Sequence, residues 1–125
     1  MTALPEIVTQ AWEQHEGPIV LTTVDRAGNP NAIYATCVRK ISEDTLVVAD
    51  NFFNKTRANI LAGSKAALLF ITKEGKSYQV KGHIEYHTAG PVFDEMKQWN
   101  PAKLPGHAAA ALKVDQVFAG GEQLA

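Results

Sequence analysis

Residues 45–72 read TLVVADNFFNKTRANILAGSKAALLFIT, and this stretch decides the fold. It opens with an apolar, β-branched run that predicts a buried strand over residues 45–50. A short polar and aromatic loop follows, and Asn54 is placed to cap a helix over residues 55–62. The continuous apolar run over residues 65–72 then predicts a second strand. The stretch therefore predicts strand, loop, two-turn helix and strand in that order.

The residues before this stretch predict a helix and a hairpin. Apolar side chains recur at helical spacing over residues 5–16, which indicates an amphipathic helix that packs on a sheet. Residues 19–24 are rich in strand formers, and DRAGNP at 25–30 is dense in turn residues. A second strand is expected over residues 32–41, so three antiparallel strands should follow one another up to residue 50.

The residues after the opening stretch predict a second hairpin. KEGK at 73–76 is a turn with Gly75 suited to positive φ, and residues 77–87 form the long partner strand. Gly82 lies midway along that strand and suggests a bulge or a close backbone approach.

The last third of the chain predicts a helix, a loop and a strand. Residues 90–100 read as a helix with apolar residues along one side, and Pro101 and Pro105 enforce a loop. Residues 107–118 are expected to form the last strand, although the alanine run also allows a helix.

Six predicted strands with short connections and three short flanking helices indicate a mainly β domain, α+β in content. The pattern fits a small closed or partly closed antiparallel barrel. The chain has 125 residues, of which 46% are hydrophobic and 20% charged, a composition that suits one globular domain over residues 1–125.

Composition excludes several classes of partner. The net charge of −1 and the scattered Lys and Arg residues disfavour nucleic acid, and no stretch approaches the ~20 apolar residues of a membrane span. Cys37 is the only cysteine, which favours a reducing, cytoplasmic setting. His83 and His87 lie on one predicted strand, about 13 Å apart, so no metal site is expected.

The predicted helix at residue 55 starts with an unusual set of side chains. Helix starts attract anions because their N–H groups are unpaired, yet here Lys55, Thr56 and Arg57 fill the first turn. A bound phosphate monoester would explain two cations and a hydroxyl at this position. The alternative is a solvated basic helix end whose side chains reach nearby carboxylates, and the spacing alone leaves both readings open.

The order of these motifs resembles the pyridoxamine 5'-phosphate oxidase-like, FMN-binding split-barrel family. The equivalents are Asn51, Asn54-Lys55-Thr56 and AALLF at residues 66–70, which follow one another without a gap. The likeness extends from the hairpin over residues 17–35 to the closing strand over residues 111–118. The resemblance implies a six-stranded antiparallel split β-barrel that binds FMN.

The same resemblance implies roles for individual residues. Lys55 and Thr56 should contact the phosphate, as Asn54 and Arg57 beside them would. Arg39 is a second candidate for a contact with the phosphate or the ring. His107 should lie near the ring, and Trp99 either packs on the barrel or stacks on a flavin from the neighbouring subunit. The remaining expected contacts lie along the ring edge, at Thr36, Cys37 and Val38, and in the loop that borders the flavin, at Asp50 and Asn51.

The sequence departs from the true oxidases of this family. Tyr34 stands where they have a phosphate-binding arginine, and the residues after 118 lack their substrate-binding extension. We therefore expect a redox-active FMN protein other than the true oxidase, a homodimer with FMN at its interface and an unidentified electron donor or small-molecule substrate. The alternatives are a non-catalytic module that binds, stores or senses flavin, and a barrel that has lost its cofactor.

Overall fold

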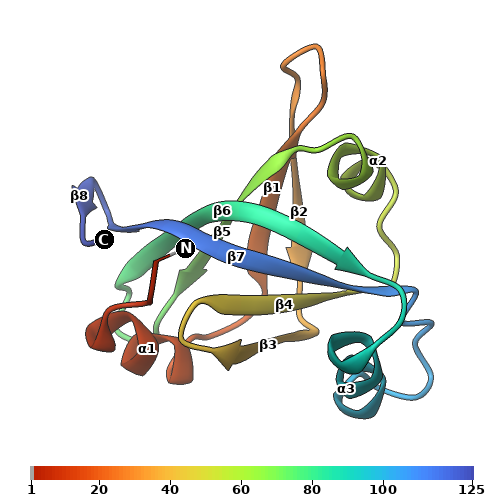
Figure 1. Cartoon of the computed structure of the whole chain (residues 1–125). Coiled ribbons are helices and arrows are strands. Elements are labelled where there is room, and N and C mark those ends of the chain that lie inside the picture. Colours follow the sequence, from red (N-terminus) through yellow and green to blue (C-terminus); the bar gives the residue numbers. More distant parts are fainter. Residues whose placement is uncertain (1) are drawn as a thin grey trace.

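The strands of this protein join into one strongly curled antiparallel sheet (Figure 1). A computed structural model describes residues 2–125. The strands are β1 Ile19–Val24, β2 Pro30–Ala35, β3 Val38–Ser42, β4 Thr45–Asp50, β5 Lys65–Ile71, β6 Ser77–His87, β7 Ala108–Ala119 and β8 Glu122–Gln123. Their order is β2-β1-β5-β6-β7-β4-β3, with the short β8 beside β7. The predicted antiparallel split barrel is confirmed, although it has eight strands rather than six.

The two edges of the sheet are consecutive in the chain. β2 pairs with β1 at one edge, β3 pairs with β4 at the other, and only Thr36 and Cys37 connect them. Two intervening residues span at most about 11 Å between Ala35 and Val38, so the sheet must curl until its edges meet. The expectation of one strand over residues 32–41 was wrong, because the chain changes its pairing partner at this link.

β4 is buried along its whole length because apolar groups cover both of its faces. Leu46 and Val48 point into the barrel and join its main core. Val47 and Ala49 point outward and form a second cluster with Met96, which is fully buried on the helix that covers them. This arrangement explains why the strand reads as continuously apolar rather than alternating.

Three helices flank the sheet, as predicted (Figure 1). α1, Glu6–Glu13, packs Val8 and Trp12 into the main core, where Trp12 lies edge-on to Phe70. α2, Lys55–Leu61, contacts β1, β2 and β6. α3, Pro91–Trp99, lies against β7 with Met96 inward, which confirms the predicted apolar side of this helix.

The alanine run at the end of the chain forms a strand, as predicted, and not a helix. β7 pairs with both β6 and β4, so its backbone groups find partners on two sides. Ala110 faces the main core while Ala109 and Ala111 face the second cluster. Tertiary pairing therefore outweighs the intrinsic helix preference of alanine.

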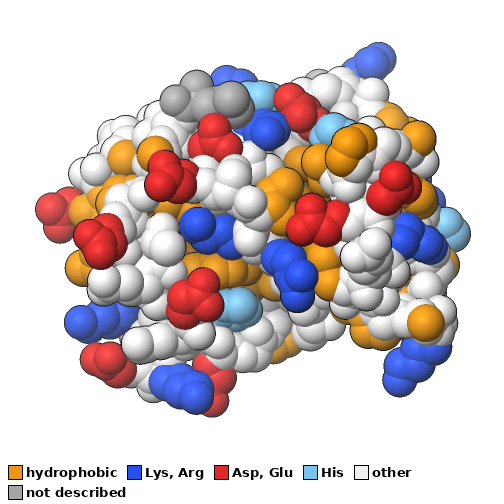
Figure 2. Space-filling model, turned by 60° about the horizontal axis from the view of Figure 1, so that its bottom comes forward, with side chains coloured by type: hydrophobic (Ala, Val, Ile, Leu, Met, Phe, Trp, Pro, Cys, Tyr) orange, Lys and Arg blue, Asp and Glu red, His pale blue; other side chains and the backbone are white. Residues whose placement is uncertain are grey.

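The surface carries charges of both signs. On the face shown in Figure 2, basic and acidic side chains are interspersed rather than gathered by sign. Within residues 2–125, every helix is too short or too polar to cross a lipid bilayer.

Gly82 marks a close approach of two strands, as its position in the sequence suggested. The pairing of β6 with β7 shifts between Lys81 and Gly82, which is a β-bulge. A Cβ atom at Gly82 would lie 1.9 Å from the carbonyl oxygen of Lys113 and 3.2 Å from Leu112 Cδ1. The backbone oxygen cannot move without breaking the ladder, so only glycine fits.

We expect Gly82→Ala to destabilise the protein by at least about 1–3 kcal/mol, because the added methyl group overlaps a backbone carbonyl. Urea unfolding measures this loss. Gly121→Ala is the matched control, since a Cβ there meets nothing within 4 Å, and it should change stability by less than about 0.5 kcal/mol. Equal stability of the two variants would contradict the close approach.

Candidate functional site

A cavity of about 400 Å³ lies where the two edges of the sheet meet. One wall comes from the end of β2 and the link to β3, and the other from the loop between β4 and α2. Ligand sites in proteins have volumes of about 300–1,000 Å³, so the cavity has the right size for a small ligand. It is lined by Ile33, Tyr34, Ala35, Thr36, Cys37, Ala49, Asn51, Phe52, Phe53 and Leu104.

Three of the residues predicted to border a flavin, Thr36, Cys37 and Asn51, line this cavity. A second cavity of similar volume lies across β1, β5, β6 and β7 and contains none of the predicted residues. The first cavity is therefore the one that the sequence expectations select.

The link between β2 and β3 offers hydrogen-bond donors to the cavity. Thr36 and Cys37 fall outside the strands, and within residues 2–125 neither backbone N–H group has a hydrogen-bond partner. The carbonyl of Cys37 is in contrast used, because it accepts from the N–H of Ala49 at 2.9 Å. Two unpaired amides at the wall of a cavity are a natural place for ligand oxygen or nitrogen atoms.

Aromatic side chains stand exposed at the rim of the cavity. Tyr34 on β2 is 78% exposed, and Phe52 in the loop after β4 is 77% exposed. Large aromatic groups contribute much of the contact energy when a flat ligand covers them. The pair gives the rim an apolar character that suits a planar ring.

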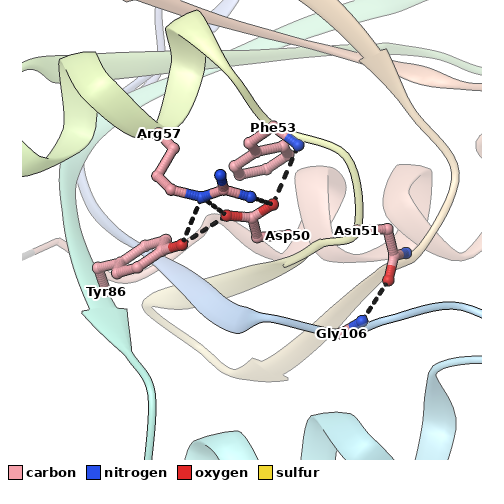
Figure 3. A network of polar contacts seen from close by, with 6 residues as sticks. All are labelled: Asp50, Asn51, Phe53, Arg57, Tyr86 and Gly106. Carbon is pink, nitrogen blue, oxygen red and sulfur yellow. Dashed lines mark hydrogen bonds and ion pairs between the residues drawn. The ribbon is translucent and has the colours of Figure 1, made fainter.

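Behind the cavity, the buried carboxylate of Asp50 accepts four hydrogen bonds (Figure 3). Arg57 donates two of them, from Nε at 2.8 Å and from Nη2 at 2.9 Å. The hydroxyl of Tyr86 donates at 2.5 Å, and the backbone N–H of Phe53 donates at 3.0 Å. Such a bidentate, charge-assisted arrangement is among the stronger polar contacts in proteins.

The ionisation of this group is set by opposing effects. Burial acts to raise the pKa of Asp50, but the hydrogen bonds from Arg57 and Tyr86 outweigh it and leave the pKa below its ordinary value. Burial and the hydrogen bond to Asp50 raise the pKa of Tyr86. Asp50 is therefore a carboxylate and Tyr86 a neutral donor at neutral pH.

Asn51 holds the other side of the same loop. Its amide exchanges two hydrogen bonds with the amide of Asn100, at 3.0 and 2.9 Å. Its oxygen also accepts from the N–H of Gly106 at 2.9 Å, and Figure 3 shows this bond. Asn51 and Asn100 are both buried. The loop after β4 is thus tied to the end of α3 and to the segment before β7.

The side chains in the first turn of α2 have different surroundings. Lys55 is exposed, and the ion pairs within residues 2–125 do not include it. Thr56 is buried and accepts a hydrogen bond from Asn31 Nδ2 at 2.9 Å. Asn54 occupies the N-cap position without a side-chain cap bond, so the expected capping role was wrong. The sequence left open whether this turn binds a phosphate or reaches nearby carboxylates. Arg57 fits the second alternative, because it pairs with Asp50.

The remaining predicted residues lie outside the cavity lining. Arg39 on β3 stacks over the ring of Trp99, with 5.5 Å between its guanidinium carbon and the ring centroid. Trp99 and the half-buried Val38 pack against the two core clusters, so Trp99 matches the packing alternative. His107 is exposed, and its backbone N–H donates to the carbonyl of Asp50 at 2.8 Å. The cofactor contacts proposed for these residues remain predictions.

Sequence reasoning missed Tyr86 and Leu104. Tyr86 lies near the end of β6, 36 positions from Asp50, and no local motif connects the two residues. Leu104 belongs to the proline-bounded loop before β7, where only the fold brings it to the cavity.

The curled sheet and the cavity at its split define a split-barrel protein. The family model for pyridoxamine 5'-phosphate oxidase matches residues 6–119, and the chain belongs to that family. Over 105 residues, the chain is 30% identical to the uncharacterized protein MJ0282 of Methanocaldococcus jannaschii, covering 80% of this chain and 70% of that protein.

Solved structures share the fold at lower sequence identity. HupZ of Group A Streptococcus aligns with a TM-score of 0.80 at 24% identity, covering 96% of this chain and 97% of that one. An FMN-binding protein of Syntrophomonas wolfei aligns with a TM-score of 0.78 at 21% sequence identity, and the alignment covers 90% of this chain and 85% of that one. HutZ of Vibrio cholerae, described as a heme storage protein, aligns with 0.68 at 18%, covering 95% of each chain.

We expect Asp50→Asn to destabilise the protein at pH 7, because it breaks the ion pair with Arg57. Breaking a buried ion pair costs about 3–5 kcal/mol, and the loss here should lie near the low end of that range because the Arg57 side chain is 35% exposed. Since pairing lowers the folded-state pKa, the contribution of Asp50 is complete above the ordinary value of 3.8 and is lost as the pH falls through the lowered value. Urea unfolding between pH 7 and pH 2 should therefore show the gap to wild type narrowing in acid.

Glu122→Gln is the control for the acid titration, because Glu122 is exposed and makes no ion pair within residues 2–125. The free energy of unfolding of this variant should differ little from that of wild type at every pH. A gap for Asp50→Asn that stays constant down to pH 2 would show that Asp50 is not held as a carboxylate.

Proposed function

We propose that this protein is a cytoplasmic FMN-binding flavoprotein with a redox role. The observation that carries the proposal is the cavity at the split of the barrel, with unpaired N–H groups of Thr36 and Cys37 in its wall and exposed Tyr34 and Phe52 at its rim. Membership of the pyridoxamine 5'-phosphate oxidase family and the likeness to an FMN-binding protein support the choice of ligand. The lone cysteine supports the compartment.

The residues present fit a flavin in the following way. The amides of Thr36 and Cys37 donate hydrogen bonds to the polar edge of the ring, and the apolar side chains of Ile33 and Ala49 exclude water from it. Lys55 is an exposed cation without an acidic partner in the described chain, and it neutralises the phosphate. When bound, FMN supplies the capacity to accept and pass on electrons or hydride.

A second candidate is a flavin-binding or storage module without catalysis. The cavity lining contains no Asp, Glu, His, Lys or Arg among the described residues, so Tyr34 and Cys37 are its only side chains that could donate or accept protons by titrating. Reduction of the bound flavin by NADH or NADPH, followed by transfer to an acceptor, supports the redox protein. A bound flavin that no physiological donor reduces supports the module.

The purified protein should show the absorption bands of an oxidised flavin, and mass spectrometry of the released ligand should identify FMN. Protein stripped of ligand should also bind added FMN. A Soret band and binding of hemin in place of FMN would contradict the proposal, as would a colourless protein that binds neither. This comparison separates a flavin site from a heme site on one fold.

We expect Lys55→Ala to weaken FMN binding by about 1.5–3 kcal/mol, which is about 10- to 150-fold, because a charge-assisted contact to the phosphate is lost. Fluorescence titration of the stripped protein measures the affinity. Lys73→Ala is the control, since Lys73 is an exposed lysine in the turn beyond the far end of β5. Equal affinities for the two variants would remove Lys55 from the site.

We also propose that the protein works as a homodimer with the cavity at the interface. The exposed Tyr34 and Phe52 would be covered by the second copy, and a flavin would be shielded from water on its open side. Gel filtration with light scattering should give twice the mass of one chain. A monomer that retains flavin would contradict this arrangement.

A further inference from the structure

We infer that Arg57 and Tyr86 are positioning residues for the cofactor site, which act through Asp50 on the loop between β4 and α2. The inference rests on the proposed function for its ligand. It also replaces the phosphate contact that the sequence suggested for Arg57 with a different role. Neither side chain lines the cavity, yet both hold the segment that does.

The loop is closed on itself by the ion pair. Asp50 is the last residue of β4, and Arg57 lies in the first turn of α2, so their two hydrogen bonds join the ends of the intervening segment. The N–H of Phe53 donates to the same carboxylate from the middle of that segment (Figure 3). Three hydrogen bonds from this loop and the start of α2 thus converge on the one buried carboxylate, and they restrict the conformation of the loop.

Tyr86 connects this loop to the barrel. It projects from β6, donates to Asp50 and accepts a hydrogen bond from Arg57 Nε at 3.1 Å. The strand pairs with β7 along this stretch, with Tyr86 opposite Ala110, and it also pairs with β5 up to His83, so it is a firm support. A hydroxyl on a fixed strand thus sets where the carboxylate, and with it the loop, is placed relative to the sheet.

The held segment forms one wall of the cavity. Asn51, Phe52 and Phe53 line it, and the opposite wall is the link at Thr36 and Cys37. Displacing such a wall by about 1 Å costs binding energy even when no contact to the ligand is deleted. Release of the loop should therefore weaken every ligand that touches this wall, with or without a phosphate.

The two roles for Arg57 predict different ligand dependence. A phosphate ligand would strengthen the binding of FMN but not of riboflavin, which has the same ring without the phosphate. A positioning residue strengthens both to a similar degree. Lysine could replace arginine as a phosphate ligand, but it cannot reproduce the planar two-point contact with Asp50.

The experiment measures the affinities of FMN and riboflavin for stripped wild-type protein and for a set of variants, by fluorescence titration. We expect Arg57→Ala and Arg57→Lys to weaken both ligands by about tenfold, and Tyr86→Phe by about fivefold. Lys55→Ala should weaken FMN alone. The double variant Arg57→Ala/Tyr86→Phe should lose less than the product of the single losses, because both act on one carboxylate.

Val80→Ala is the control for a loss of stability alone, because Val80 is fully buried in the barrel core and does not line the cavity. All titrations are made at a temperature where circular dichroism shows each variant folded. Val80→Ala should lower the melting temperature and leave both affinities unchanged. An affinity loss confined to FMN in Arg57→Ala, or wild-type affinities in Tyr86→Phe, would overturn the inference.

Hydrogen exchange tests the positioning role without any ligand. The backbone amide of Phe53, which donates to Asp50, should exchange faster in Arg57→Ala and Tyr86→Phe than in wild type, and at the wild-type rate in Val80→Ala. Unchanged exchange in the first two variants would overturn the inference. If wild type binds neither FMN nor riboflavin, the proposed function fails while this measurement still decides the role of Arg57 and Tyr86.

Discussion

The link of two residues between β2 and β3 is the constraint on which this structure depends. Thr36 and Cys37 join strands that lie at opposite edges of the sheet, and so short a connection is satisfied only when the sheet closes on itself. Closure leaves a seam without strand pairing, and the seam is where unpaired N–H groups and a cavity are found together. The site is therefore a product of barrel geometry.

Polar groups support the cavity from behind while its lining stays largely apolar. Asp50 and Asn51 are adjacent in sequence, yet one is tied to α2 and β6 and the other to the end of α3 and the segment before β7. Burying a carboxylate costs free energy unless it is fully paired, and four donors meet that requirement here. The loop that follows β4 is thereby held by two separate sets of hydrogen bonds.

Most elements could be predicted from the sequence because their signals are local. Apolar runs marked β4, β5 and β7, turn residues marked the hairpins, and Gly82 marked a bulge that the structure confirms. The change of partner at Thr36 carries no glycine or proline, so nothing local separates β2 from β3. The contact of Tyr86 with Asp50 depends on strand order, which no window of sequence contains. Arg57 showed a cation at a helix start, but its acidic partner became apparent only in three dimensions.

The position of β7 in the sheet has a consequence for biosynthesis. β7 is the last long strand of the chain, yet it lies between β6 and β4, and β4 has no other partner on that side. While the ribosome still holds residues 108–119, β4 exposes an unpaired edge and the barrel cannot close. Nascent chains therefore stay in an open, association-prone form until residues 108–119 have been made and released.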